Sequence, residues 1–321
     1  MVTLKEKYKD YFTIGAAVNS KTLKNDKEVL INNFSSITCE NAMKFGEIYD
    51  EDNGYNFECA DFQYNFAKEN RLKMRGHNFV WHNQTPKFIM ENDREKVIDI
   101  LTNHMKIMND RYGDIITAWD VVNEAIEDKS DEYLRKSVWR DKLGEDYIKE
   151  VYKIARKTIN KGTELFYNDY NEYIPDKLDK IVRMIKSVNA DEKLIDGMGM
   201  QCHINLYYPS VDVMRRAIEA YAALGLRIHI TEMDVSYFEF NDKSIWDAPE
   251  PELVEKHAKV YSDFFKLFRE YKDYIDNVTL WGITDDYTWL DEFPLKNRKN
   301  WPLLFDVDGK PKNSFYAVTD F

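Results

Sequence analysis

Short apolar runs alternate with longer amphipathic segments along most of the chain. The apolar runs, rich in β-branched and aromatic residues, occupy residues 12–18, 34–38, 72–79, 115–122, 163–167, 194–200, 226–231 and 278–283. Their length and composition predict buried strands. Between them, residues 95–112, 145–160, 175–188, 210–224 and 251–274 space their apolar positions as helices do. Ser210 is placed to cap the fourth of these helices, and Gly225 to end it.

This alternation predicts an α/β fold in which eight strands and their helices form a (β/α)8 TIM barrel. A doubly wound sheet is the alternative, but no glycine-rich fingerprint follows the first strand. No linker rich in Ser, Gly or Pro, no low-complexity block and no repeat divides the sequence. We therefore expect residues 1–321 to form a single domain.

The composition narrows the choice of partners and compartment. A formal net charge of −12 argues against nucleic acid and anionic membranes as partners. Cys39, Cys59 and Cys202 are widely spaced without a C-x-x-C pair, which favours free thiols in a reducing compartment. The first residues show no apolar signal segment, and no run reaches membrane-spanning length. We expect a cytoplasmic protein, or a secreted one if a signal peptide has been removed, of unknown oligomeric state.

Polar and aromatic residues collect where the predicted strands end, and reactive groups of such barrels lie at the carboxyl ends of strands. After residues 115–122, an amide and a carboxyl stand side by side as Asn123 and Glu124. This pair suits chemistry on a neutral polyol, because the amide can hold a hydroxyl while the carboxyl donates a proton. Such chemistry needs a second carboxylate, and Glu232 closes another β-branched run.

The same strand ends carry a series of motifs in chain order. The most specific is Trp119-Asp120-Val121-Val122-Asn123-Glu124-Ala125, and the others lie at residues 40–44, 76–84, 167–171, 197–203, 230–234, 279–282 and 302–306. Together they resemble the glycoside hydrolase family 10 endo-β-1,4-xylanases over nearly the whole chain. Residues 291–301 and the lack of an appended domain look most like the compact intracellular members.

The resemblance implies a retaining enzyme that hydrolyses xylan-derived xylo-oligosaccharides by double displacement, with no metal or cofactor. Glu124 would be the general acid/base and Glu232 the nucleophile, about 5–5.5 Å apart as retention requires. His203 would bond the nucleophile while Asp234 holds the other side of its ring. The remaining residues would contact substrate or support the pair: Asn123 (at the 2-hydroxyl) and Gln201; Glu40, Asn41, Lys44, His77, Trp81 and Gln84 on the non-reducing side; Trp281 and Trp289 as cleft walls; and Tyr170 and Asn171 on the leaving-group side. Trp289 and Gln84 would crowd carbon 5 and so favour xylose over glucose.

Other interpretations remain open at this point. The chain could be a retaining β-glucanase or mannanase, or a barrel that binds sugars without cleaving them. A metalloenzyme is disfavoured because His77, His82, His203 and His229 form no H-x-H or H-E-x-x-H pattern. We expect His82 and His229, like His104, His257 and Asp120, to be structural. The acidic stretch 239–255 is interpreted as a solvated loop, with trimming of the cleft or binding of a partner chain as alternatives.

Overall fold

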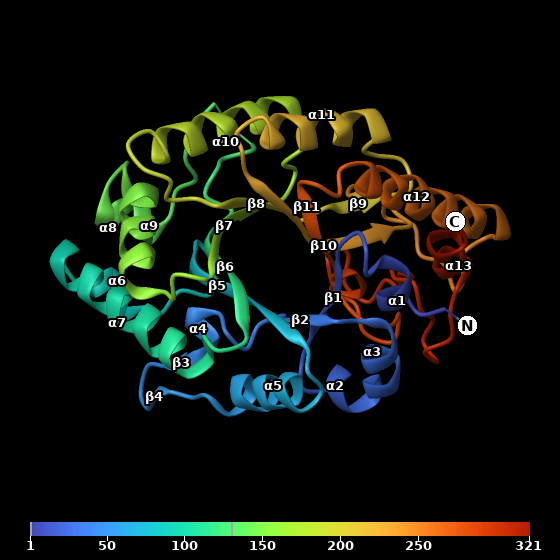
Figure 1. Ribbon diagram of the computed structural model, residues 1–321, viewed down its shortest axis with the longest axis horizontal. Coiled ribbons are helices and arrows are strands. Elements are labelled where there is room, and N and C mark those ends of the chain that lie inside the picture. The colour runs from blue at the N-terminus through green and yellow to red at the C-terminus, as the bar shows by residue number, and fades with distance from the viewer. Residues whose placement is uncertain (1, 130) are drawn as a thin grey trace.

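Eight parallel strands close into a barrel in the computed structural model, which describes residues 2–129 and 131–321 (Figure 1). Around the barrel they follow the order β1-β2-β5-β6-β7-β8-β10-β11, and β11 pairs with β1. Their bounds are β1 Thr13–Val18, β2 Ser36–Cys39, β5 Lys73–Trp81, β6 Ile116–Asn123, β7 Glu164–Asp169, β8 Gly197–Met200, β10 Arg227–Ser236 and β11 Ile275–Leu280. The predicted (β/α)8 barrel is confirmed.

Helices form a ring outside the strands, as Figure 1 shows. The main ones are α3 (Lys27–Asn33), α5 (Glu58–Glu69), α7 (Arg94–Tyr112), α9 (Tyr147–Thr158), α10 (Pro175–Val188), α11 (Val211–Ala222), α12 (Pro251–Glu270) and α13 (Asn313–Thr319). Shorter elements are α1 (Leu4–Tyr8), α2 (Thr22–Asn25), α4 (Phe45–Ile48), α6 (Phe88–Glu91), α8 (Val138–Leu143), the 3₁₀ helix η1 (Trp289–Asp291), and the small hairpin of β3 (Tyr49–Asp50) and β4 (Gly54–Tyr55). The oxygen of Ser210 accepts a hydrogen bond from the Val213 amide, which confirms the predicted cap of α11. Gly225, with a φ of 71°, lies three residues beyond the end of that helix.

The bounds of most predicted strands shift by one or two residues at an end, and three differ by three residues or more. The strand predicted at 194–200 begins only at Gly197, because the Asn189 side chain accepts hydrogen bonds from the Leu194 and Ile195 amides. The strand predicted at 278–283 is Ile275–Leu280, and Ile283 is instead buried in the loop that follows. The strand predicted to end at residue 231 continues to Ser236, so Glu232 lies within it.

The extension of β10 has a clear partner. A short strand, β9 (His203–Asn205), pairs with it in parallel, and Asp234 is opposite His203. The sequence pattern did not predict β9, because three residues are too few to show a period. This pairing places His203 and Asp234 on neighbouring strands.

The interior of the barrel contains a buried polar cluster among its apolar residues. The guanidinium of Arg75 donates to both oxygens of Asp120, at 2.7 and 3.0 Å, and its Nε donates to Nδ1 of His229 at 2.9 Å. Both Arg75 and Asp120 are almost fully buried. Each buried charge therefore has a partner, as a buried ion requires. Asp120 is thus buried and hydrogen-bonded, as predicted, and His229 is also buried and bonded.

The acidic stretch forms a loop up to residue 250, after which α12 begins at Pro251. Most of residues 239–250 are exposed, which agrees with the predicted solvated loop. Two contacts join it to the loop that follows η1: Arg298 Nη1 donates to the Asp242 carbonyl at 2.5 Å, and the Phe240 ring lies 5.8 Å from the Phe293 ring.

The three cysteines are free thiols, as predicted. Among residues 2–129 and 131–321, none of the helices combines the length and the apolar character that crossing a bilayer requires.

Candidate active site

The residues predicted for the site gather at the carboxyl-terminal side of the barrel. Glu40 follows β2, Glu124 follows β6, Tyr170 follows β7, Gln201 follows β8 and Trp281 follows β11. His77 and Trp81 belong to β5, His203 to β9, and Glu232 and Asp234 to β10. Since parallel strands all end on the same side, one face holds residues that are far apart in the sequence.

Glu124 takes an unusual backbone conformation at the point where β6 ends. Its φ is 55°, and its amide donates to the Asn168 carbonyl at 2.9 Å. The side chain is 13% exposed, so it is shielded but accessible. Oε2 accepts from Nε1 of Trp81 at 2.9 Å, and Oε1 accepts from Nε2 of Gln201 at 3.1 Å. These two donors aim the carboxyl group.

Glu232 is more deeply buried, and its carboxylate has two partners. Oε1 accepts from Nδ2 of Asn168 at 2.8 Å, and Oε2 lies 3.2 Å from Nε2 of His203. The other ring nitrogen of His203 lies 2.9 Å from Oδ2 of Asp234. That same oxygen accepts from Nε1 of Trp289 at 2.8 Å.

Electrostatics keep Glu232 ionised. Burial alone would raise the pKa of Glu232, but the hydrogen bond from His203, the charges of His77 and His203 and the bond from Asn168 lower it below its ordinary value. Burial opposes protonation of His203, yet the carboxylates of Asp234 and Glu232 raise its pKa to about 10. A protonated His203 can therefore donate to both carboxylates at neutral pH.

A group of amides joins the two glutamates. The Asn123 side chain lies 2.9 Å from the amide nitrogen of Asn168, which contacts Glu232, and 3.3 Å from that of Gln201, which contacts Glu124. Glu124 and Glu232 thus belong to one hydrogen-bonded cluster.

Charged and amide side chains that follow β2 and β5 contact one another near the Trp81 ring. Lys44 is buried, donates to Oδ1 of Asn41 at 2.9 Å, and lies 4.6 Å from the centre of the Trp81 ring. Burial lowers the pKa of Lys44, although the negative charges of Glu232, Glu40, Glu124 and Glu47 oppose that effect. Gln84 donates to Glu47 at 2.6 Å, with a longer contact of 3.5 Å to Asn41.

His77 and Trp281 contact each other, and Trp281 also reaches His203. The Nδ1 atom of His77 is 3.0 Å from Asp120, and its ring meets the edge of the Trp281 ring at 5.5 Å. Trp281 also approaches His203 edge-on at 6.2 Å.

Tyr170 and Asn171 follow β7 and share one acidic partner. The Tyr170 hydroxyl and the Asn171 amide both donate to the carboxylate of Asp128, each at 3.3 Å.

Comparisons with known proteins identify the family. The sequence model of glycosyl hydrolase family 10 matches residues 3–321. The chain belongs to that family. It is 50% identical to the endo-1,4-beta-xylanase A of Caldicellulosiruptor saccharolyticus, over 100% of this chain and 96% of that protein. It is 43% identical to the endo-1,4-beta-xylanase B of Paenibacillus barcinonensis, over 98% and 97% of the two chains.

Solved structures also superimpose closely on this chain. The crystal structure of an endo-1,4-beta-xylanase from Caldicellulosiruptor owensensis superimposes with a TM-score of 0.97 at 49% identity, over 100% of both chains. A mutant protein solved in complex with xylotriose also gives a TM-score of 0.97, at 48% identity over 100% of both chains.

Within this family 10 barrel, several residues to which the sequence analysis gave no role contact the predicted site residues. Asn168 donates to Glu232, Asn19 and Tyr287 hold Glu40 at 3.0 and 3.2 Å, and Glu47 holds Gln84. Asn19 directly follows β1, the one barrel strand whose end supplied no predicted residue. Its position directly after a predicted strand could have marked Asn19 as a candidate site residue. Tyr287 lies in the loop after β11, where no periodic pattern exists.

The histidines of this family 10 barrel do not converge on a common centre. Among the described residues, a single group has metal-ligand geometry: Glu164, His229 and Asp276. These residues lie near the amino ends of β7, β10 and β11, away from the glutamate pair. Nδ1 of His229 accepts from Arg75, and Nε2 lies 2.7 Å from Asp276, so both ring nitrogens already have partners. The group is therefore explained by hydrogen bonding.

Proposed function

We propose that this chain is a retaining endo-β-1,4-xylanase that hydrolyses xylan-derived xylo-oligosaccharides by double displacement. One observation carries the proposal: Glu124 and Glu232 share a hydrogen-bonded cluster in which Glu232 is held ionised. A pair of carboxyl groups in different environments is what glycoside hydrolysis requires. Membership of family 10 and the xylanase names of the relatives support the same activity.

In the first step, the carboxylate of Glu232 attacks the anomeric carbon while protonated Glu124 gives its proton to the glycosidic oxygen. The bond to the leaving sugar breaks, and a glycosyl ester with Glu232 forms. In the second step, Glu124, now a carboxylate, takes a proton from water. That water attacks the anomeric carbon and releases Glu232. The bonds from Trp81 and Gln201 aim Glu124 for both proton transfers.

We further propose that His203 and Asp234 orient Glu232, and that Asn123 and Gln201 support the pair, with Asn123 bonding the 2-hydroxyl. The non-reducing sugars would contact Glu40, Asn41, Lys44, His77, Trp81 and Gln84, and the leaving sugar would meet Tyr170 and Asn171. Trp281 and Trp289 would form the walls around the reacting sugar.

Xylose specificity would depend on two rigid groups. Gln84 is held by Glu47, and Trp289 is fixed by its bond to Asp234. Neither side chain can move aside freely for the hydroxymethyl group of a glucoside. An aryl β-xylobioside should therefore react much faster than the matching aryl β-cellobioside. Equal rates, or faster reaction of the cellobioside, would favour a β-glucanase.

A time course of products from reduced xylohexaose tests endo action. Internal cleavage gives several products at once, whereas release of xylose alone from one end would exclude it. Binding without any hydrolysis would favour a sugar-binding barrel. Loss of activity with a chelator would favour a metalloenzyme; we expect activity to be unchanged.

We also propose a cytoplasmic location, supported by three unpaired cysteines, of which Cys59 is exposed. Cell fractionation tests this location, with activity on an aryl β-xylobioside measured in each fraction. Activity found mainly outside the cells would contradict it.

A further inference from the structure

The backbone of Glu124 lies in a conformation that residues with a Cβ atom rarely adopt. Its φ of 55° is in the left-handed region, which persists only where surrounding contacts enforce it. Two hydrogen bonds do so, one on each side of the residue. The amide donates to the Asn168 carbonyl at 2.9 Å, and the carbonyl accepts from Nε of Arg135 at 3.0 Å.

Arg135 reaches this carbonyl because the chain turns back on itself after β6. Ile126 and Leu134 form an antiparallel bridge, and the Arg135 amide donates to the Ala125 carbonyl at 2.8 Å. The Arg135 side chain is only 14% exposed. It is therefore held beside Glu124 rather than free in solvent.

The far end of the same guanidinium contacts the leaving-group side. Nη2 donates to the Tyr170 hydroxyl at 2.7 Å and to Oδ1 of Asp128 at 3.3 Å. Asp128 in turn accepts from Tyr170 and Asn171. One rigid planar group thus bonds both the backbone of Glu124 and the residues on the side where the leaving sugar departs.

We propose that Arg135 is a positioning residue that fixes the direction from which Glu124 gives its proton to the leaving group. The inference rests on the proposed xylanase activity. It predicts that the loss of Arg135 slows only those substrates whose leaving group must be protonated as it departs. Good leaving groups depart without acid assistance and should be affected much less.

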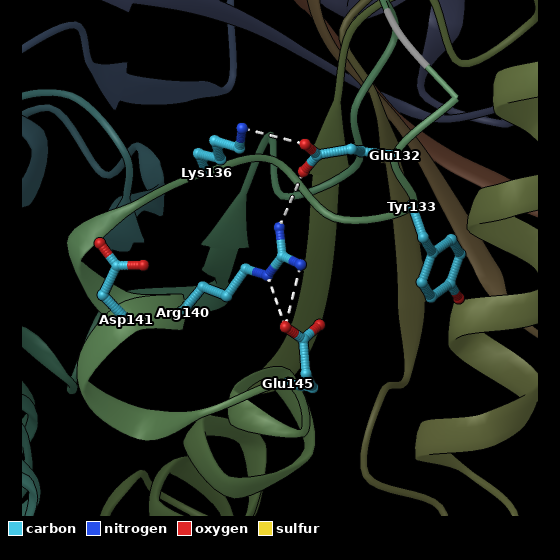
Figure 2. Close-up of a pocket in the computed structure, with 6 residues that line it drawn as sticks. All are labelled: Glu132, Tyr133, Lys136, Arg140, Asp141 and Glu145. Atoms are coloured by element: carbon cyan, nitrogen blue, oxygen red, sulfur yellow. Dashed lines mark hydrogen bonds and ion pairs between the residues drawn. The ribbon is translucent and has the colours of Figure 1, made fainter.

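Arg140 offers a matched control on the same connection, at the start of the helical segment that follows. Figure 2 shows its guanidinium between Glu132 and Glu145. Together with Tyr133, Lys136 and Asp141, these residues line a hollow of about 620 Å³. Arg140 donates to Glu132 at 3.2 Å, Glu145 at 2.9 Å and the Leu134 carbonyl at 3.0 Å. Like Arg135, it joins carboxylates to a backbone carbonyl, but its bonds involve neither Glu124 nor Tyr170.

The experiment compares phenyl and 2,4-dinitrophenyl β-xylobiosides with the wild type, Arg135→Met, Arg135→Lys and Arg140→Met. The ratio of kcat/KM for the two substrates is measured within each preparation, so it does not depend on the folded fraction. We expect Arg135→Met to lose at least tenfold more activity on the phenyl substrate than on the dinitrophenyl one. Arg135→Lys, which can restore one of the three side-chain bonds, should recover part of the ratio, and Arg140→Met should keep the wild-type ratio.

Equal losses on both substrates in Arg135→Met and Arg135→Lys would overturn the inference and leave Arg135 a structural residue. The absence of any loss of activity in the two Arg135 variants would also overturn it, and so would a shifted ratio in Arg140→Met. If the wild type cleaves neither xylobioside, the proposed function itself fails, and the inference fails with it.

Discussion

The imidazole of His203 lies against the carboxylate of Glu232, with Nε2 3.2 Å from Oε2. Asp234 contacts the opposite nitrogen at 2.9 Å, so the ring bridges two carboxylates. This geometry links the charge of His203 both to the ionisation of Glu232 and to the stability of the fold.

The stability of the protein should depend on this proton. The folded pKa of His203 is raised to about 10, whereas a histidine in an unfolded chain titrates near ~6.5. The contribution is therefore complete below the unfolded pKa and is lost as the pH rises through about 10. His203→Gln should destabilise most near pH 6 and progressively less toward pH 10. Denaturant unfolding of both proteins across that range measures the difference, and a pH-independent difference would contradict this prediction.

The barrel itself could be predicted because its strands are short apolar runs whose period and spacing survive in the sequence. The side chains around Glu232 were harder to predict. Asn168 and Asp169 are adjacent, and alternation sends their side chains to opposite faces of β7. Asn168 turns to Glu232, whereas Asp169 pairs with Lys177 of α10 at 2.8 Å. The sequence identifies the strand end but does not indicate which of the two faces inward.

Arg135 shows a second limit of sequence reasoning. It follows Glu124 in an irregular connection, and only the bridge between Ile126 and Leu134 returns it to the Glu124 carbonyl. No periodic pattern encodes such a return. The resemblance to a family supplied roles for residues inside motifs, but Arg135 lies outside the motifs that carried it.

Asn168→Ala should impair Glu232 directly. Losing a hydrogen bond to a charged group costs about 1.5–3 kcal/mol, which corresponds to roughly 10- to 100-fold in rate. The pKa of Glu232 should also rise toward its ordinary value, because the bond from Asn168 helps to lower it. We therefore expect the acid limb of the kcat/KM profile to move to higher pH. Asn160→Ala, which alters an asparagine at the other end of the barrel, is the control, and an unmoved acid limb in Asn168→Ala would argue against this role.

Glu124→Gln should separate the two chemical steps. Without its acid, hydrolysis of xylo-oligosaccharides should fall by about 10²–10⁴-fold. A dinitrophenyl xylobioside needs no protonation, so its first step should survive while the second, which needs a base, becomes slow. Stopped-flow absorbance should then show a burst of dinitrophenolate. A substrate-independent loss with no burst would mean that Glu124 is not the acid/base.

Gly76 precedes His77 on β5 and should tolerate no side chain. A Cβ atom there would lie 2.1 Å from the ring of Trp119, which is itself fully buried. Gly76→Ala should destabilise the protein by at least about 1–3 kcal/mol, as overpacking of a core does. At Gly162 a Cβ meets nothing within 4 Å, so Gly162→Ala should be neutral or slightly stabilising. Thermal unfolding compares them, and similar melting temperatures for the two variants would refute the packing argument.

The role of Glu232 as nucleophile can be tested by trapping its ester. A 2,4-dinitrophenyl 2-deoxy-2-fluoro-β-xylobioside has a good leaving group, and its fluorine slows the release of the sugar. Mass spectrometry of the digested protein should find one fluoroxylobiosyl group on the peptide that contains Glu232. A label on the peptide that contains Glu124, or an unlabelled protein that turns over the normal substrate, would contradict the retaining pair.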